Sequence, residues 1–326
     1  MKQTPTTEAL ANRIKAHQTF FPAFSFYTKG AKEKAIKKKA PFLKALDLHR
    51  TSFLKSSAKT FLIVNSYAMF HVKHSFQQGE TTMNFEAFKQ KTIEIFALNP
   101  SLPTLSDDQI EKLFRLTEIM LEVNKSMNLT AITEESAVIL KHYADSISVS
   151  AMIPEGAKAI DIGCGAGFPT LPLAIARPDL SITGLDSTAK RIEYVKSTAL
   201  KLGLDNVSAI AGRAEDYANK PEYREAFDIA TARAVAALPI LTEICLPFVR
   251  LGGKFVAMKA SQGENEANLS KNAIILCGGA LDSISTLSLT ADAQSFETRI
   301  IISVSKVSHT PPKYPRHYSQ ISKKPL

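Results

Sequence analysis

Short apolar segments alternate with amphipathic ones from about residue 157 onward, and this alternation constrains the fold more than any other feature of the chain. Apolar segments separated by stretches of helical spacing are typical of parallel strands that have helices on both faces. The sequence therefore predicts an α/β fold with a doubly wound, Rossmann-like sheet. The parallel strands are expected at residues 159–163, 181–186, 207–211, 227–231 and 254–258.

Two further segments, 281–289 and 299–307, alternate apolar and polar residues and are joined by a short connection. This pattern predicts an antiparallel pair at the edge of the sheet. Four prolines follow in the tail from residue 311 to the end, and we expect that tail to be irregular.

A helical leader is expected before the sheet. Residues 84–98 have helical spacing, and Ser106 with Gln109 forms a capping-box signature at the start of a second helix. A third helix is expected from residues 133–136 to about 150. These patterns divide the chain into an extension at 1–82, a helical leader at 83–153, and a catalytic-type domain at 154–326 with a basic C-terminal tail.

The charge of the chain is concentrated at its beginning. The formal net charge is +9, but residues 1–82 alone carry +10 and the remainder carries −1. The first segment also holds 9 of the 18 Phe and has no regular apolar period. It is consistent with a disordered basic arm that binds RNA, with a targeting segment, or with upstream DNA translated from an early start codon.

The third of these interpretations is the one we favour, with Met83 as the start. Residues 69–74 can be encoded by an inverted repeat that resembles a chromosome-partition site. Residues 78–80 can be encoded by a purine run that resembles a ribosome-binding site. A genuine flexible basic arm is the alternative.

Composition excludes several classes of protein. Hydrophobic residues make up 45% of the chain and charged residues 22%, values that are ordinary for a globular protein. There is no apolar run of the length that spans a bilayer. Cys164, Cys245 and Cys277 have neither disulfide-framework nor zinc spacing, so we expect a reduced, cytoplasmic protein with no metal site.

A glycine-rich turn follows the first expected strand, in the segment from Asp161 to Pro169. Its Gly-x-Gly-x-Gly spacing differs from the Gly-x-Gly-x-x-Gly that accompanies a bound pyrophosphate. The carboxylate of Asp161 would repel a pyrophosphate and attract an ammonium group. This favours S-adenosylmethionine, which carries an α-amino group and a cationic sulfonium. We expect Gly163 and Gly165 to leave room for its methionine end, with Gly167 in the same pocket and Phe168 as one wall.

The next two strand ends extend this site. Asp186 follows the second strand at the spacing expected for a ribose contact, and Ala214 and Glu215 follow the third, in position for adenine. Three such features at consecutive strand ends are more specific than any one of them. Ordinary turns of a doubly wound fold, or an NAD-type cofactor, are the weaker alternatives.

From Met83 to Leu326 the chain resembles the RsmG (GidB) family. The resemblance rests on residues 128–130, 142–146, 161–169, 185–187 with 190–191, 212–215, 232–234, 259 and 314–316. It implies a class I S-adenosylmethionine-dependent methyltransferase that modifies position 7 of one guanine in bacterial 16S rRNA. Cys164, Thr170 and Ala260 depart from the family pattern, and these departures concern loop packing.

Arg233, at the end of the fourth strand, is the candidate catalytic residue. That strand end lacks the (Asn/Asp)-Pro-Pro-(Tyr/Phe) motif of adenine amino methylation and a Pro-Cys nucleophile for cytosine. Guanine position 7 has a lone pair and no proton, so no general base is required and alignment should dominate catalysis. An arginine can present a planar fork to guanine or phosphate, whereas the resemblance implies contact with the cofactor. A surface arginine is the remaining interpretation.

Five residues are candidates for RNA contact: His142, Asp145, Lys259, Tyr314 and Arg316. His142 and Asp145 share one helical face, and a His–Asp pair that holds the leader to the sheet is an equally plain interpretation. A C-terminal basic strip is a further candidate for phosphate contact; it comprises Lys306, Lys313, Arg316, Lys323 and Lys324.

The resemblance thus implies an enzyme that acts on 16S rRNA, on the small ribosomal subunit or on its assembly intermediate, and we expect it to be a monomer. Methylation of another RNA or of a small molecule is an alternative, since fold does not fix substrate. A non-catalytic chromosome-partition or cell-division accessory protein is the alternative from another class.

Overall fold

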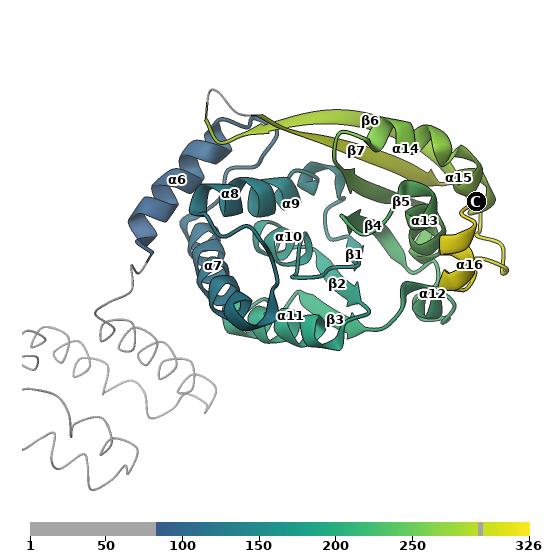
Figure 1. Cartoon of the computed structure of the whole chain (residues 1–326), viewed down its shortest axis with the longest axis horizontal. Helices are drawn as coiled ribbons and strands as arrows, with labels where there is room; N and C mark the ends of the chain where they lie inside the picture. The colour runs from purple at the N-terminus through teal and green to yellow at the C-terminus, as the bar shows by residue number, and fades with distance from the viewer. Residues whose placement is uncertain (1–82, 293–295) are drawn as a thin grey trace, which may run out of the picture. The chain divides into compact units, whose positions relative to one another are not determined.

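The computed structural model describes residues 83–292 and 296–326 (Figure 1), so the predictions for residues 1–82 lie outside the described part of the chain. A seven-stranded sheet lies at the centre, in the order β3-β2-β1-β4-β5-β7-β6. The first five strands are parallel, and β7 is antiparallel to both of its neighbours. The strands are β1 (Lys158–Ile162), β2 (Ser181–Asp186), β3 (Val207–Ala211), β4 (Phe227–Arg233), β5 (Val249–Lys259), β6 (Gly279–Thr290) and β7 (Phe296–Lys306).

Helices precede the sheet and connect its strands. The leader contains α6 (Phe85–Ala97), α7 (Asp107–Met127), α8 (Glu135–Val138), the π-helix η3 (Ile139–Ala144), α9 (Asp145–Ile147) and the 3₁₀-helix η4 (Ser150–Met152). The remaining helices are α10 (Thr170–Ala176), α11 (Ala189–Leu202), α12 (Ala214–Tyr217), α13 (Leu238–Cys245), η5 (Leu246–Phe248), α14 (Gly263–Leu269), α15 (Lys271–Leu276) and α16 (Tyr318–Lys323).

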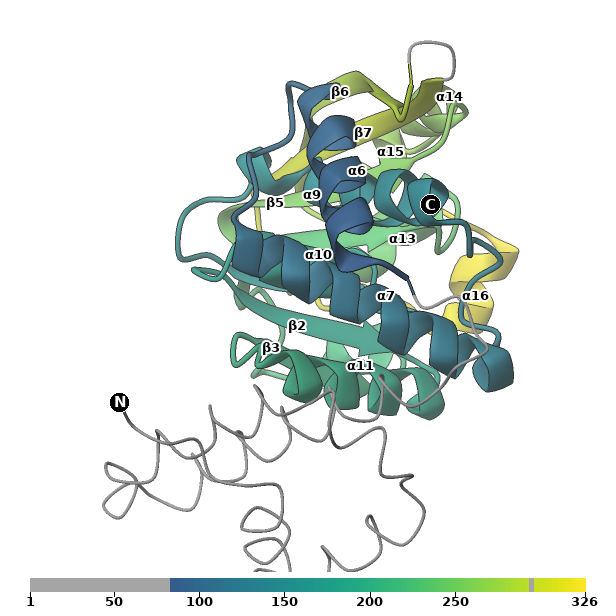
Figure 2. The same ribbon diagram turned by 90° about the vertical axis from the view of Figure 1, so that its left-hand side faces the viewer.

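The two faces of the sheet bury two separate apolar clusters, because side chains alternate along each strand. Ala159 and Ile229 pack with the leader, α10 and α11 on one face, while Ile160 and Ala230 pack with α13 and η5 on the other. The views agree: α7, α10 and α11 cover one side of the strands and α13 covers the opposite side (Figures 1 and 2). This confirms the doubly wound α/β fold with an antiparallel edge pair.

The leader helices share the first of these clusters with the sheet. Ser106 caps α7, and the reciprocal bonds with Gln109 form the expected capping box. The buried side chain of Asn99, just after α6, donates to the carbonyl of Thr290 at 2.8 Å and accepts from its amide at 3.0 Å. The leader is therefore tied to the far end of β6 as well as to α10 and α11.

The third leader helix is present as expected, but it contains the π-helical turn η3, which carries His142 and lies immediately before Asp145. The structure corrects the expectation for the tail, which is not irregular throughout. Helix α16 begins after the first three of the four tail prolines, and His317 caps it by accepting from the amide of Ser319. Among the described residues, no helix combines the length and apolar character needed to cross a membrane.

Candidate functional site

The glycine-rich turn lies between β1 and α10, at the carboxyl edge of the parallel strands. Gly163, Gly165 and Gly167 all have positive φ, at 76°, 54° and 85°. Residues with side chains rarely adopt this conformation, so the turn favours glycine at each of the three positions.

The three glycines differ in what a side chain would meet. A Cβ at Gly163 would lie 2.6 Å from Val235, and one at Gly167 would lie 2.6 Å from Leu171, so protein packing excludes both. At Gly165 the nearest atom would be the carbonyl oxygen of Gly163, at 3.8 Å. The middle glycine therefore borders open space, as a position that admits a ligand should.

Asp161 lies beneath the turn with 1% of its surface exposed. Its Oδ2 accepts from the hydroxyl of Thr170 at 2.6 Å, and its Oδ1 accepts from that of Thr231 at 3.2 Å. Burial raises the pKa of this carboxyl to about 6, against the lowering effect of the two hydroxyls and Arg233. Thr170, a departure from the family pattern, thus serves as a partner of Asp161.

Asp186 ends β2 and braces the turn from the side. Its Oδ2 accepts from the amide of Gly165 at 3.0 Å, and its Oδ1 accepts from the amide of Thr188 at 2.7 Å. Each carboxylate oxygen has further lone pairs, so Asp186 can hold the turn and still accept from a ligand hydroxyl.

The end of β3 turns directly into α12, which begins with Ala214 and the buried Glu215. A cavity of about 450 Å³ adjoins this turn and extends to α16. It is lined by Arg213, Glu215, Asp216, His317, Tyr318, Ser319 and Ser322. Of the predicted cofactor residues, Glu215 lines this cavity, and the C-terminal helix forms part of its wall.

Arg233 ends β4 and is anchored by one of its nitrogens. Nη1 donates to the carbonyl of Lys141 at 3.0 Å and to Oδ2 of Asp145 at 2.8 Å. The guanidinium carbon lies 5.3 Å from the ring centroid of Phe168, within the range of a cation–π contact. Nε and Nη2 have no partner among residues 83–292 and 296–326, so two donor nitrogens remain for a ligand.

His142 packs against the glycine turn. Its ring stacks on Phe168 with 4.4 Å between centroids, and its Nε2 lies 2.9 Å from the hydroxyl of Thr130. Burial, together with the nearby Arg233, lowers the pKa of His142 to about 4, so the imidazole is neutral at pH 7. The expected alternative of a His142–Asp145 pair is not found, since Asp145 bonds to arginines.

Lys259 connects two segments near the end of β5. Its Nζ lies 2.7 Å from both the carbonyl of Ala236 and the carboxylate of Glu266. It thereby holds the segment after Arg233 against α14. This contact places Lys259 next to the site but gives its ammonium two partners within the protein.

The remaining RNA candidates, Tyr314 and Arg316, lie in the tail and not at the glycine turn. Arg316 donates from Nε and Nη2 to both oxygens of the fully buried Glu243, and Tyr314 is buried. The basic strip is corrected here: Lys306 is buried and paired with Glu225 at 3.0 Å. Burial lowers the pKa of Lys306 despite that partner. The exposed cations of the strip are Lys313, Lys323 and Lys324.

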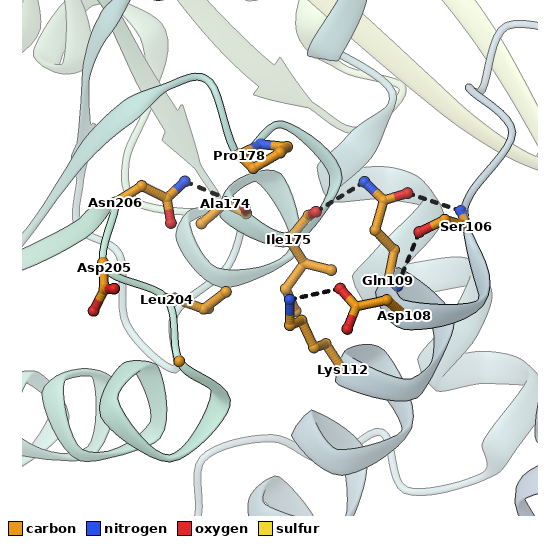
Figure 3. Close-up of a pocket in the computed structure, with 11 residues that line it drawn as sticks. Ser106, Asp108, Gln109, Lys112, Ala174, Ile175, Pro178, Leu204, Asp205 and Asn206 are labelled. Carbon is orange, nitrogen blue, oxygen red and sulfur yellow. Dashed lines mark hydrogen bonds and ion pairs between the residues drawn. The ribbon is translucent and has the colours of Figure 1, made fainter. Parts of the chain in front are cut away.

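A second cavity, of about 490 Å³, lies at the opposite edge of the sheet (Figure 3). Its lining includes Asn206, just before β3, and Pro178, just before β2. Gln109 of the leader donates there to the carbonyls of Ile175 and Ala176 and so covers the end of α10. This cavity adjoins the amino ends of the strands, away from the predicted site.

The described residues contain no cluster of His, Cys, Asp and Glu that could hold a metal.

The strand order, the glycine turn after β1 and the acidic residues after β2 and β3 define the class: an S-adenosylmethionine-dependent methyltransferase domain of class I. Residues 109–295 match the family model GidB, described as rRNA small subunit methyltransferase G. The chain belongs to this family.

Curated relatives agree with the family model. The chain is 43% identical over 222 residues to "Ribosomal RNA small subunit methyltransferase G" of Desulfitobacterium hafniense, covering 68% of this chain and 91% of that protein. It is 40% identical over 248 residues to the protein of the same name from Lactobacillus delbrueckii, covering 75% and 100%. Among solved structures, the O-methyltransferase from Bacillus cereus in complex with SAH has 20% identity and a TM-score of 0.42, covering 59% of this chain and 91% of that one.

Proposed function

We propose that this protein transfers a methyl group from S-adenosylmethionine to position 7 of a guanine in the 16S rRNA of the small ribosomal subunit. The observation that carries the proposal is membership of the family, with 40–43% identity to relatives that are named for this class of reaction. The proposal includes action as a monomer in the cytoplasm, on the rRNA, on an assembly intermediate or on the small subunit itself.

The residues at the strand ends fit the cofactor. Gly165 borders open space, Asp186 keeps lone pairs for ribose hydroxyls, and the cavity beside α12 suits adenine. Asp161 is buried under two hydroxyls, so it favours a cation through its field and not by direct contact. We assign the cofactor site to Asp161, Gly163, Gly165, Gly167, Phe168, Asp186, Ala214, Glu215 and Arg233.

The reaction requires alignment of the methyl donor with guanine more than it requires proton transfer. S-adenosylmethionine supplies a methyl group on a positively charged sulfur, and position 7 of guanine offers a lone pair without a proton. Nε and Nη2 of Arg233 have no partner within the described part of the chain, so they can donate to the carboxylate of the cofactor or to the acceptor edge of guanine. The neutral His142 and the Phe168 ring form the apolar wall beside it.

The RNA surface follows from which cations are free to bind phosphate. His142, Asp145, Lys259, Tyr314 and Arg316 are all engaged within the protein or buried. We propose that Lys313, Lys323 and Lys324 contribute phosphate contacts from the exposed tail.

Substitution of Gly165 tests the cofactor site. Gly165→Val should abolish S-adenosylmethionine binding, measured by calorimetry, because the side chain fills the open space beside the turn. Gly156→Val is the matched control: Gly156 also has a positive φ, at 66°, and no atom within 4 Å of its Cβ position, but it lies before β1. Equal affinity in the two variants would contradict the assignment.

Mapping of 7-methylguanosine in rRNA tests the reaction. A deletion strain should lose one such mark in 16S rRNA, and the wild-type gene should restore it. Loss of a mark from another RNA would favour the alternative substrate. A wild-type protein that binds no S-adenosylmethionine would favour the accessory function.

A further inference from the structure

Asp145 lies between two arginines that come from different strands of the sheet. Arg233, at the end of β4, donates from Nη1 to Oδ2 at 2.8 Å, and Arg299 of β7 donates from Nε to Oδ1 at 3.0 Å. The carboxylate is 5% exposed, and the two arginine side chains are 15% and 17% exposed. Each oxygen of this nearly buried carboxylate thus has its own cationic donor.

The arrangement differs from the usual geometry of such a pair. Arginine and carboxylate commonly form two parallel hydrogen bonds, in which one guanidinium takes both oxygens. Here Arg299 occupies Oδ1, and Arg233 reaches Oδ2 through a single nitrogen. Arg299 is held in turn by Glu297, 3.2 Å from its Nη1, and by the carbonyl of Thr298.

This sharing determines which donors of Arg233 stay free. Nη1 is fixed by Asp145 and the carbonyl of Lys141, and the guanidinium lies beside the Phe168 ring. Without Arg299, Oδ1 of Asp145 would be a buried acceptor without a donor, which is costly. The neighbouring Arg233 could then satisfy both oxygens by turning its fork toward Asp145.

We propose that Arg299 is a positioning residue for the reaction, an inference that rests on the proposed role of Arg233. By occupying Oδ1, Arg299 prevents Asp145 from taking two donors of Arg233. Nε and Nη2 of Arg233 therefore stay available to the reactants. Arg299 acts through Asp145 and touches no reactant.

The test is a double-mutant cycle on single-turnover methylation of small-subunit rRNA from a deletion strain, with rates given per folded molecule of the full-length chain. Arg299→Met should lower the rate about tenfold, within the range of couplings between contacting residues. Arg299→Lys, which keeps a cation for Oδ1, should retain most of the rate. Asp145→Asn should also lower the rate, and the double variant should be no slower than Asp145→Asn alone.

Lys254→Met is the control. It removes another ion pair between strands of the sheet, from Lys254 of β5 to Asp282 of β6 at 2.7 Å, and it should leave the rate unchanged. If Arg299→Met does not fold, the comparison of Asp145→Asn with the double variant still decides, since neither leaves a buried carboxylate unpaired. A double variant about tenfold slower than Asp145→Asn, or an Arg299→Met enzyme with the wild-type rate, would overturn the positioning role. A folded wild-type chain that methylates no rRNA would overturn the proposed function itself.

Discussion

Two arginines of this protein each meet a buried carboxylate, yet they use their donors differently. Arg316 binds Glu243 with Nε, Nη2 and its own backbone amide, and Nη2 also donates to the carbonyl of Lys324, so both of these side-chain nitrogens are engaged within the protein. Arg233 binds Asp145 with one nitrogen, because Arg299 takes the other oxygen. The first arrangement ties the tail to α13, whereas the second leaves donors at the carboxyl edge of the sheet. We propose that this difference in occupied donors distinguishes a structural arginine, Arg316, from a functional one, Arg233.

The largest effect is expected on stability, from removal of the Arg316 side chain that pairs with Glu243. Arg316→Met leaves the buried Glu243 without a cation, with only the backbone amide of residue 316 as donor, which should lower the free energy of unfolding by about 3–5 kcal/mol. Chemical denaturation measures this loss, and the methylation rate per folded molecule should stay near wild type. Adding Glu243→Gln should recover much of the stability. A variant of normal stability with weakened RNA methylation would instead return Arg316 to the RNA surface.

Arg233→Lys should show the opposite behaviour. Lysine can keep a cation near Asp145 but cannot present a planar fork, so the rate of methylation should fall about a hundredfold, equivalent to about 2.7 kcal/mol. The unfolding free energy should change by less than about 1 kcal/mol, since a lysine at this position can still pair with Asp145. Wild-type turnover in the folded variant would make Arg233 a second structural arginine and remove the contrast.

The secondary structure and the charge pairs of this protein also differed in how well they could be predicted from the sequence. The strands and the capping box of Ser106 were predicted within a few residues, because apolar periodicity and caps are local signals. The glycine turn was predicted at its strand end for the same reason. Whether its residues bind a cofactor stays a prediction.

The partners of charged residues could not be read from the sequence. Arg299 lies 154 residues from Asp145, and no spacing rule connects them. Lys306 was grouped with exposed cations of the tail, but it ends the buried strand β7 and meets Glu225 from a distant loop. Burial and pairing of charges depend on tertiary contacts, which local patterns do not contain.

A third prediction concerns Asp161, the buried carboxylate beneath the glycine turn, which has no arginine partner within the described residues and should make stability depend on pH. The folded pKa of Asp161 is about 6, above its ordinary 3.8, so the folded state binds this proton more tightly than the unfolded chain. Its contribution to stability is greatest below pH 4 and is lost as the pH rises to about 6. In the absence of cofactor, the free energy of unfolding of the wild type, relative to that of Asp161→Asn, should fall by about 2–3 kcal/mol between pH 4 and pH 7. A constant difference across that range would mean that Asp161 is not buried as described.

The smallest effect is expected at Thr130, which reaches the site only through His142. Thr130→Val removes the hydroxyl that lies 2.9 Å from Nε2 of His142 and that accepts from the amide of Ile132 at 3.0 Å. The turn itself is also held by Asn124, which bonds both backbone groups of Thr130, so its shape should persist. Loss of the hydroxyl should lower stability by about 1 kcal/mol. The neutral imidazole stays stacked on Phe168, so we expect the methylation rate to change by less than about threefold. Thermal unfolding and the rRNA assay measure the two quantities. A large loss of rate at unchanged stability would show that Thr130 contacts the RNA. The functional residues would then include part of the leader as well as Arg233.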